Sequence, residues 1–406
     1  MTNDHYSSGR RSVPYLADIK PAPFKGNNTE RRVSALPKAG GIRAKLLMIP
    51  STGKKIRVLV VDDSALMRQF ISDILRSDPR IEVAGTARDG RDALAQIQTL
   101  KPDLVTMDVE MPNMSGLQAL EEIMRTNPLP VIMVSSMTQE GAETTLKALA
   151  LGCVDFIGKP SGSISLNIKT VGQELIDKVI AASTARIRTK AGIFGASHSL
   201  PHAPDFRRMT PPMNLTGRRD IVAIASSTGG PMALSELIPK LPKKFPLPIV
   251  ITQHMPKEFT PSFAKRLNDS SQLEVVEGFD GLTLKPGRVV IAPGGKHLII
   301  KRRGGQAVCG LSDAPPVLSV KPAANIMFLS IADEYGGNVL CVILTGMGRD
   351  GTDGAVALKR KGAYVIAESQ KTCVVYGMPK AAVDAGVVDE VLPLNEIPDA
   401  MVRLVK

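Results

Sequence analysis

A serine pair follows a buried strand in the second half of the chain. The apolar run Ile221–Ala225 predicts that strand, and Ser226, Ser227, Thr228 and two glycines come directly after it. Pro231 suits the first turn of a helix, where a backbone N–H would have no partner. Strand, tight turn and helix lift a serine to the carboxyl edge of an α/β sheet, beside a helix end that stabilises negative charge. The same turn could instead bind a phosphate. The serine is expected to be a nucleophile only if the chain also supplies a base and an acid that orients it.

A histidine and an aspartate follow two further predicted strands. Leu247–Thr252 leads to His254, and Asn338–Leu344 leads to a glycine-rich loop that holds Asp350. Because parallel strands end at one edge, these side chains should meet the serine there, as nucleophile, base and orienting acid. Taken singly, each has a structural interpretation as a helix cap, a satisfied hydrogen-bonding group or an Asx turn. The chain order Ser, His, Asp and the lack of Gly-x-Ser-x-Gly exclude the α/β-hydrolase fold.

Two alternatives concern the nucleophile and the base. We expect Ser227 to be the nucleophile because it stands directly before the turn, whereas Ser226 still belongs to the strand. His297 is the rival base, but it opens a predicted strand, Leu298–Lys301. A residue at the start of a strand faces the other edge of the sheet unless a hairpin reverses the direction. We therefore expect His254 to be the base.

The first half of the chain alternates apolar strands with amphipathic helices, which predicts a doubly wound parallel sheet. The predicted strands are Ile56–Val61, Ile81–Gly85, Leu104–Met107, Val131–Val134 and Cys153–Ile157, and the predicted helices are Ala65–Ser77, Gly90–Thr99, Ser115–Thr126, Gly141–Leu151 and Ile168–Ile187. The second half is a further run of strand and helix patterns. We predict two α/β domains, a five-stranded parallel one and a larger, mostly parallel one.

Charged and hydroxyl side chains follow the strands of the first predicted sheet: Asp62, Asp63, Asp108, Ser135 and Lys159. Three carboxylates at one edge repel one another unless a divalent cation joins them, and an all-oxygen site with room for water suits Mg²⁺. Such a cation would also screen an incoming phosphoryl group, so that one carboxylate can attack phosphorus. Lys159 and Ser135 could then hold the phosphate by charge and by hydrogen bond.

Composition limits the functional classes. The chain has 406 residues, enough for two domains, with 43% apolar, 22% charged and 4% aromatic residues and no Trp, which gives little for a nucleic-acid stacking platform. No apolar run approaches the ~20 residues of a membrane helix, and the N-terminus has no apolar signal region. The four cysteines are scattered, so neither disulfides nor a zinc site is indicated. We expect a cytoplasmic protein.

The excess positive charge is concentrated at the N-terminus. Residues 1–55 hold eleven Lys/Arg and three Asp/Glu, which is eight of the net twelve charges. This segment lacks periodicity and is predicted to be a disordered basic extension. Residues 56–187 form the first predicted domain, the Pro-rich segment 188–219 is a linker, and residues 220–406 form the second domain. His198 and His202 lie in the linker and are expected to be solvated.

Residues 56–185 resemble a two-component receiver domain in the segments Val-Val-Asp-Asp-Ser, Met-Asp-Val-Glu-Met-Pro and Gly-Lys-Pro. The resemblance implies that Asp108 accepts the phosphoryl group. It also implies that Mg²⁺ is held by Asp62, Asp63, Asp108 and the backbone carbonyl of Glu110. Ser135 and Phe156 occupy the positions of the switch hydroxyl and switch aromatic, beside Lys159. In receivers the bond corresponding to Lys159–Pro160 is typically cis.

The whole chain is similar to the chemotaxis protein-glutamate methylesterase (CheB) family. The shared segments are Ser-Ser-Thr-Gly-Gly-Pro, Thr-Gln-His-Met-Pro, Ala-Pro-Gly-Gly-Lys-His-Leu, Leu-Thr-Gly-Met-Gly-Arg-Asp-Gly and Val-Val-Tyr-Gly-Met-Pro. The resemblance implies a triad of Ser227, His254 and Asp350, with Thr228 and the Met347 N–H assisting the oxyanion. It further implies a phosphorylation-regulated hydrolase that demethylates glutamate methyl esters and deamidates glutamines, without a cofactor for hydrolysis.

The implied partners are a chemotaxis histidine kinase as phosphodonor and the cytoplasmic domains of chemoreceptors as substrate. We expect the unphosphorylated first domain to dock over the active-site edge and phosphorylation of Asp108 to weaken that docking. One segment departs from the family pattern: residues 320–325 read Val-Lys-Pro-Ala-Ala-Asn, where the family has a His-Arg-Pro-Ser-Val-Asp-like sequence, so Lys321 replaces arginine and Asn325 an acid. Lysine cannot form the forked contact of arginine.

Three other functions remain open. The second domain could be an amidase or esterase of another sensory array, or a non-catalytic adaptor that has kept the fold. A DNA-binding output would require a compact basic helix-turn-helix module, which the α/β pattern of residues 220–406 disfavours.

Overall fold

The computed structural model describes residues 54–159, 168–185, 187–189, 192–194 and 217–405, and these residues belong to one compact unit. The predicted basic extension lies outside the described residues except for its last two. The Lys159–Pro160 bond and the linker histidines His198 and His202 lie outside them as well.

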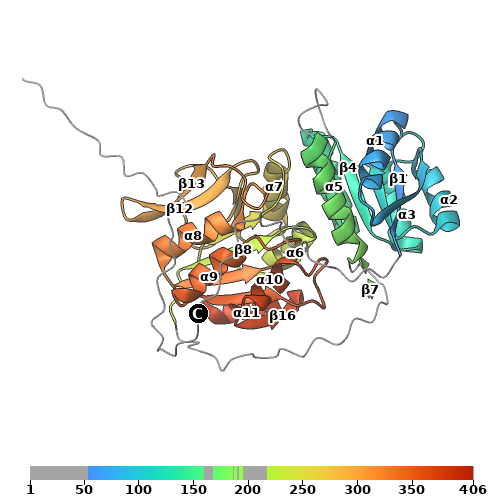
Figure 1. Ribbon diagram of the computed structural model, residues 1–406. Coiled ribbons are helices and arrows are strands. Elements are labelled where there is room, and N and C mark those ends of the chain that lie inside the picture. The colour runs from blue at the N-terminus through green and yellow to red at the C-terminus, as the bar shows by residue number, and fades with distance from the viewer. Residues whose placement is uncertain (1–53, 160–167, 186, 190–191, 195–216, 406) are drawn as a thin grey trace, which may run out of the picture. The chain divides into compact units, whose positions relative to one another are not determined.

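Five parallel strands form the first sheet, in the spatial order β2-β1-β3-β4-β5 (Figure 1). The strands are β1 (Ile56–Val61), β2 (Ile81–Ala87), β3 (Leu104–Asp108), β4 (Val131–Ser135) and β5 (Asp155–Gly158), and the helices are α1 (Ala65–Arg76), α2 (Gly90–Leu100), α3 (Gly116–Thr126), α4 (Gln139–Leu151) and α5 (Ile168–Ser183). This order is that of flavodoxin-like doubly wound sheets, which confirms the predicted fold class.

Helices cover both faces of the first sheet, so its central strands β1, β3 and β4 are mostly apolar. Val58 and Val60 of β1 share a core with residues of α1 and α5, whereas Leu59 and Val61 belong to the core with α2, α3 and α4. Side chains at the helix starts fix the boundaries. Ser115, for example, forms a reciprocal capping box with Gln118 at the start of α3.

The last helix of the first domain is shorter than predicted. It ends at Ser183 rather than at Ile187. Thr184 and Ala185 donate backbone hydrogen bonds to Ala181 and Ala182, three residues back, so the last turn tightens and the helix stops. Ile187 instead pairs with Phe194 in a small antiparallel sheet of β6 (Ile187–Thr189) and β7 (Gly192–Phe194), at the start of the predicted linker.

A second sheet of seven parallel strands has the order β10-β11-β9-β8-β14-β15-β16. Its strands are β8 (Ile221–Ser226), β9 (Ile249–Gln253), β10 (Glu274–Glu277), β11 (Arg288–Ile291), β14 (Val339–Ile343), β15 (Tyr364–Glu368) and β16 (Glu390–Leu392). A separate antiparallel ribbon consists of β12 (His297–Arg303) and β13 (Gln306–Ser312). The larger, predominantly parallel α/β domain is therefore confirmed.

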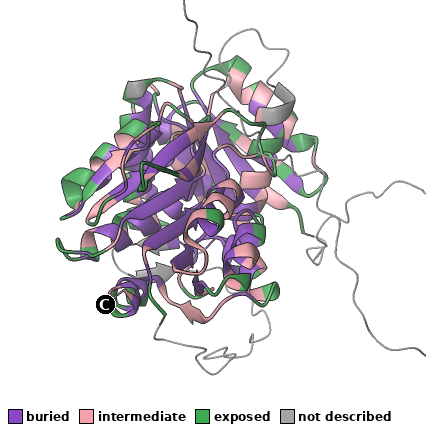
Figure 2. Ribbon diagram, turned by 90° about the vertical axis from the view of Figure 1, so that its left-hand side faces the viewer, coloured by how far each residue is buried: buried purple, intermediate pink, exposed green. Residues whose placement is uncertain are grey.

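Helices again cover both faces of the second sheet. They are α6 (Gly230–Leu237), η1 (Ile238–Lys240), α7 (Thr260–Ser270), α8 (Ala324–Tyr335), α9 (Thr352–Arg360), α10 (Met378–Asp384), η2 (Leu394–Glu396) and α11 (Ile397–Leu404). Alternate residues of β8 belong to two cores, one with α8, α9 and α10 and the other with α6, α7 and α11. Figure 2 shows the strands buried and the outer faces of the helices exposed.

The strand order reverses at β8, whose neighbours β9 and β14 continue in opposite directions along the sheet. In open α/β sheets the crevice outside the strand ends at such a switch point is where ligands bind. Ser226, the last residue of β8, pairs with Gln253, the last of β9. Ser227 and His254 therefore each stand one residue beyond the same rung of the sheet.

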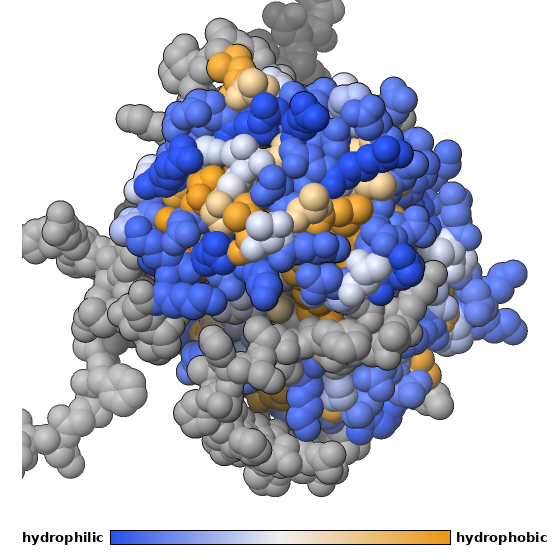
Figure 3. All heavy atoms as spheres, turned by 90° about the vertical axis from the view of Figure 1, so that its right-hand side faces the viewer, coloured by the Kyte–Doolittle hydropathy of each residue, from blue (hydrophilic) through white to orange (hydrophobic). Residues whose placement is uncertain are grey.

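None of the described helices is long and apolar enough to cross a membrane. The face of the molecule drawn in Figure 3 is mostly hydrophilic, with a strip of apolar residues across it.

Candidate active site

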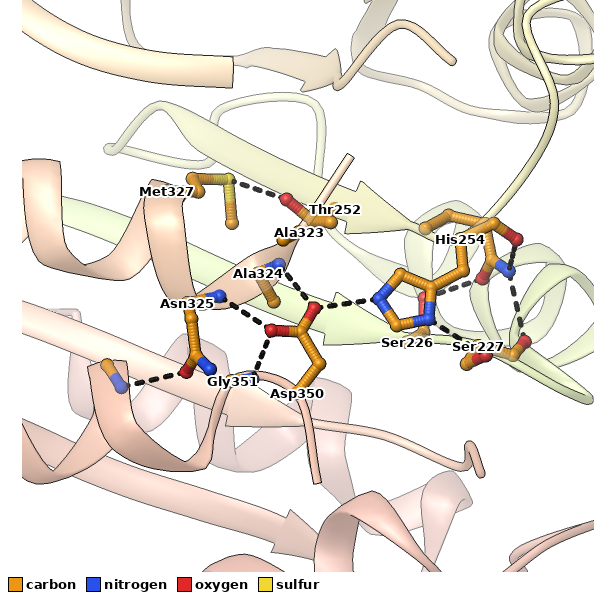
Figure 4. A network of polar contacts seen from close by, with 12 residues as sticks. Ser226, Ser227, Thr252, His254, Ala323, Ala324, Asn325, Met327, Asp350 and Gly351 are labelled. Carbon is orange, nitrogen blue, oxygen red and sulfur yellow. Dashed lines mark hydrogen bonds and ion pairs between the residues drawn. The ribbon is translucent and has the colours of Figure 1, made fainter. Parts of the chain in front are cut away.

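The hydroxyl of Ser227 faces the ring of His254, and the other side of that ring faces Asp350 (Figure 4). Ser227 Oγ lies 3.1 Å from His254 Nδ1, and His254 Nε2 lies 2.8 Å from Asp350 Oδ2. The Asp350 side chain is only 3% exposed and the His254 side chain 13%. The structure thus brings the three residues selected from the strand ends into one continuous chain of hydrogen bonds.

The turn that carries Ser227 is fixed by backbone hydrogen bonds. Ser227 donates its N–H to Thr345 O (3.0 Å), and its carbonyl accepts from Gly230 N (2.7 Å). Gly229 has φ +76°, which L side chains rarely adopt, and a Cβ there would lie 2.5 Å from Val374 Cβ. The first glycine of the pair is therefore required both by conformation and by space.

Three backbone N–H groups hold the carboxylate of Asp350. Ala324 N (2.6 Å) donates to Oδ2, while Asn325 N (3.0 Å) and Gly351 N (2.9 Å) donate to Oδ1. Burial raises the pKa of Asp350, but the hydrogen bonds from His254, Asn325 and Ala324 outweigh it and leave the pKa below its usual value. Asp350 is therefore ionised and acts only as an acceptor.

An ionised Asp350 decides the tautomer of His254. Because the carboxylate can only accept, Nε2 must carry the proton, and Nδ1 presents its lone pair to Ser227. That is the state in which an imidazole can accept the serine proton.

The atypical segment 320–325 supports the acid through its backbone. A cis Lys321–Pro322 bond precedes Ala324 and Asn325, whose N–H groups reach Asp350. The Asn325 side chain accepts a hydrogen bond from Gly354 N at the start of α9 (2.9 Å), and Lys321 Nζ donates to Asp313 O (3.0 Å). Neither substituted side chain contacts the carboxylate of Asp350 among the described residues, so the departures leave its backbone cradle in place.

The rival base, His297, serves a different purpose. It is fully buried, its Nδ1 accepts from Ala323 N (3.0 Å), and its Nε2 lies 3.1 Å from Pro315 O. Both ring nitrogens are thus engaged by the two ends of the 315–323 segment. With both nitrogens occupied there, His297 holds the segment that leads into α8, and neither nitrogen faces Ser227.

The predicted oxyanion groups flank Ser227. A Cβ on Gly346 would lie 2.8 Å from Ser227 Cβ, so the loop that contains Met347 runs directly beside the serine. Within the part of the chain that the structure describes, no hydrogen bond leaves the backbone N–H of Thr228 or of Met347. The Thr228 hydroxyl, in contrast, is engaged and donates to Asp155 Oδ2 (2.6 Å).

A second chemical site lies at the carboxyl edge of the first sheet. Side-chain oxygens of Asp62, Asp63 and Asp108 all lie within 4.8 Å of one another. Lys159 Nζ is 2.8 Å from Asp108 Oδ2 and 3.1 Å from Asp62 Oδ2. The backbone N–H of Glu110 donates to Asp108 Oδ1 (3.4 Å). The all-oxygen donor set and its spacing fit a hard divalent cation such as Mg²⁺.

The acidic cluster is electrostatically unfavourable without a cation. Burial raises the pKa of Asp108 to about 6, and the neighbouring Asp62 acts in the same direction, while Lys159 opposes both. Burial lowers the pKa of Lys159, but its contacts with Asp108 and Asp62 leave a net increase. A carboxylate held in this way gains stability when a cation joins the site.

Comparison with known proteins decides the family. The model described as CheB methylesterase matches residues 222–401, and the model of the response regulator receiver domain matches residues 58–169. A protein-glutamate methylesterase/protein-glutamine glutaminase of Pyrococcus abyssi is 45% identical over 366 residues, which are 88% of this chain and 96% of that protein. The chain belongs to the CheB methylesterase family.

Other relatives of the same description are similarly close. Those of Geobacillus kaustophilus and Thermotoga maritima are 48% and 47% identical, over 87% of this chain and 99% and 100% of theirs. The crystal structure of the Thermotoga maritima CheB methylesterase catalytic domain is 48% identical, with a TM-score of 0.45, and covers 46% of this chain and 99% of that one. We call residues 56–183 the receiver domain and residues 220–405 the methylesterase domain.

The two residues predicted to occupy switch positions, Ser135 and Phe156, are both packed side chains. Ser135 is fully buried, donates to Gly141 O (3.2 Å) and accepts from Thr145 Oγ1 (2.8 Å), both in α4. Phe156 is also buried, and its ring centroid lies 4.4 Å from that of Phe259 in the methylesterase domain. Phe156, the predicted switch aromatic, therefore directly contacts the domain that holds the candidate triad.

Sequence reasoning missed three supports of the candidate triad. They are the backbone donors Ala324 and Asn325, the imidazole of His297, and the side chain of Gln253, which contacts both Ser227 and His254 through their carbonyls. The sequence had drawn attention to His297 and to the segment 320–325 for other reasons, and Gln253 could have been found because it directly precedes His254 at the end of a predicted strand.

Proposed function

We propose that this protein hydrolyses glutamate methyl esters on chemoreceptors to glutamate and methanol, and that it also deamidates receptor glutamines. The observation that carries the proposal is the chain of hydrogen bonds from Ser227 through His254 to Asp350. The names of relatives that align over nearly their whole length support the substrate class. Ester and primary-amide hydrolysis by acyl transfer needs a nucleophile, a proton carrier and oxyanion donors, which this site can supply.

In the proposed first half-reaction, Ser227 Oγ attacks the carbonyl carbon while Nδ1 of His254 takes the hydroxyl proton. Asp350 holds Nε2–H and stabilises the imidazolium that forms. The backbone N–H groups of Thr228 and Met347 would stabilise the oxyanion. Collapse of the intermediate breaks the ester C–O bond, and His254 passes its proton to the leaving methoxide to give methanol.

In the second half-reaction, water attacks the acyl-serine while His254 takes one of its protons. Breaking the acyl–Oγ bond returns that proton to Ser227 and releases the glutamate side chain. A glutamine substrate follows the same steps with ammonia as the leaving group.

The acidic cluster is proposed to be the phosphorylation site of the receiver domain, with a chemotaxis histidine kinase as phosphodonor. Asp62, Asp63, Asp108 and the carbonyl of Glu110 would hold Mg²⁺, which screens charge around the phosphoryl group when bound. Asp108 is the proposed acceptor, and Lys159 and Ser135 would contact the phosphate. We propose that the protein acts in the cytoplasm, where it would meet such a kinase and the cytoplasmic domains of chemoreceptors.

The receiver domain is proposed to inhibit the methylesterase domain until it is phosphorylated. Support comes from two buried contacts between the domains: the hydrogen bond from Thr228 Oγ1, next to Ser227, to Asp155 Oδ2, and the Phe156–Phe259 ring contact. Asp155 directly precedes the switch aromatic in β5. Movement of Phe156 would therefore displace Asp155 and weaken its hydrogen bond with the Thr228 hydroxyl.

Methanol release from methylated receptor tests the proposed activity. Ser227→Ala should abolish release, and a serine-directed phosphonate should label Ser227 in the unaltered protein. Ser226→Ala should keep most of the activity. A folded protein that is labelled at Ser227 but releases no methanol would favour an esterase or amidase of another sensory array. The absence of both labelling and release would favour a non-catalytic adaptor.

A further inference from the structure

The side chain of Gln253 joins the residues on either side of the Ser227–His254 contact. Its Nε2 donates to Ser227 O (3.0 Å) and to His254 O (3.0 Å), and its Oε1 accepts from Ser226 Oγ (2.7 Å). Gln253 is 2% exposed and Ser226 is fully buried. We propose that Gln253 is a positioning residue that sets the distance between the candidate nucleophile and its base.

The hydrogen-bonding capacity of an amide requires this orientation. The carbonyls of Ser227 and His254 can only accept, so the NH₂ end of Gln253 must face them. The oxygen end then faces Ser226, whose hydroxyl must be the donor. Ser226 therefore has an assignable part in the site: it fixes the direction of the Gln253 amide without touching substrate.

The second glycine of the turn makes room for this amide. A Cβ on Gly230 would lie 2.0 Å from Gln253 Oε1 and 2.8 Å from Ser226 Cβ. Gly230 has no positive φ, unlike Gly229, so its backbone conformation does not demand glycine. Space for the Gln253 side chain is thus a sufficient reason for glycine at position 230.

The Gln253 amide acts on the geometry that the proposed chemistry needs. The carbonyl of Ser227 also accepts from Gly230 N (2.7 Å), and His254 N donates to Ser226 O (3.1 Å). Together with Gln253 these bonds tie the ends of β8 and β9 at the point where the two reacting side chains leave the backbone. Displacement of a reacting group by about 1 Å costs on the order of 100-fold in rate.

Two substitutions of Gln253 separate hydrogen bonding from packing. Gln253→Met keeps the volume of the side chain and removes all of its hydrogen bonds. Gln253→Glu keeps the shape and an acceptor for Ser226, but when ionised it has no N–H to donate to the carbonyls of Ser227 and His254. Both should lower kcat by about 10- to 100-fold with less than a twofold change in KM, because the substrate is not contacted. Labelling of Ser227 by a serine-directed phosphonate should slow by the same factor.

Thr252→Val is the matched control. Thr252 is a fully buried neighbour on the same strand, and its hydroxyl contacts Met327 Sδ (3.2 Å) rather than the turn. Loss of the Thr252 hydroxyl should lower the free energy of unfolding without slowing the labelling of Ser227. Ser226→Ala should have a small effect alone, within about threefold, and no further effect in the Gln253→Met protein, since coupled residues are non-additive. Gly230→Ala, which displaces the amide, should resemble Gln253→Met.

The inference rests on the proposed function, but the two can fail separately. If the unaltered protein is labelled at Ser227 while releasing no methanol, the proposed substrate is wrong and the labelling rates still test Gln253. If both Gln253 variants are folded and label at the rate of Thr252→Val, the positioning role is overturned. A rise in KM at constant kcat would overturn it too, because it would indicate a contact with substrate. Should the Gln253 variants not fold, labelling of Gly230→Ala at the unaltered rate would likewise overturn the positioning role.

Discussion

Nδ1 of His254, the ring nitrogen nearer the main chain, faces Ser227 at 3.1 Å, and Nε2 faces Asp350 at 2.8 Å. The main chain explains this orientation. His254 N donates to Ser226 O, so the backbone of the base runs beside the nucleophile and the nearer nitrogen is the one that reaches it. The farther nitrogen is left for the acid, which enters from the loop after β14.

Asp350→Asn tests the tautomer assignment. Asparagine has only one amide oxygen, and an NH₂ at the Oδ2 position opposes one backbone donor, Ala324 N, whereas at the Oδ1 position it would oppose two. The NH₂ should therefore face His254, so that the proton of His254 is no longer held on Nε2. We expect kcat for methanol release to fall by about 10³- to 10⁴-fold with the fold retained. Asp353→Asn is the control, since Asp353 is an exposed partner of Arg349 only a few residues away. Equal activity of the two variants would contradict the assignment.

The lowered pKa of Asp350 predicts a pH dependence of stability. An unfolded aspartate titrates near ~3.9, and the folded-state pKa is lower, so folding favours the ionised form. This contribution is complete above the unfolded pKa and is lost as the pH falls through the folded pKa. The difference in unfolding free energy between the unaltered protein and Asp350→Asn should be constant from pH 7 to about 5 and shrink below about 4. Urea unfolding at each pH measures it, and a difference that grows on acidification would contradict the sign.

Gly229→Ala should damage the serine turn. It combines a positive φ, which costs about 1–2 kcal/mol for a residue with a Cβ, with the contact at 2.5 Å from Val374. We expect a loss of about 2–5 kcal/mol in unfolding free energy. Gly304→Ala shares the positive φ (+58°) but has nothing within 4 Å of the added Cβ, so it should lose only the conformational part. Equal losses would show that space at Gly229 is unimportant.

Removing the Asp155 carboxylate tests inhibition by the receiver domain. Asp155→Ala leaves Thr228 without its hydrogen-bond partner, and we expect methanol release by the unphosphorylated protein to rise toward that of a fragment starting at Arg218. Asp177→Ala, which removes a carboxylate from α5 that has no contact with Thr228, should leave the basal rate unchanged. The inhibition hypothesis fails if the fragment and the full-length unphosphorylated protein have equal activity.

Mg²⁺ should stabilise the receiver domain through the acidic cluster. A ligand that binds the folded state alone adds about 2.7 kcal/mol at 100 times its dissociation constant. We expect thermal unfolding of the receiver domain to shift upward with Mg²⁺, and Asp63→Ala to remove the shift. Asp103→Ala, which removes a carboxylate paired with Lys54 at another place, should keep it. A shift that survives Asp63→Ala would locate the cation elsewhere.

The sequence determined where the chemistry-bearing strands end. Strands buried on both faces are nearly continuous apolar runs, so the polar residues that follow each run mark the carboxyl edge. That pattern placed Ser227, His254 and the three receiver aspartates correctly at their edges. It was less reliable at weaker boundaries: β5 begins at Asp155 rather than Cys153, and α5 stops four residues early because its last turn tightens.

Only the tertiary structure decided how these groups are held. Asp350 meets His254 across 96 residues of sequence, and its backbone donors Ala324 and Asn325 come from the start of another helix. Backbone N–H groups carry no side-chain signature, and the choice between two ring nitrogens depends on where the main chain passes. The sequence could name the serine, the imidazole and the carboxylate, while their orientation and the amide of Gln253 between the two strands depend on contacts between distant segments.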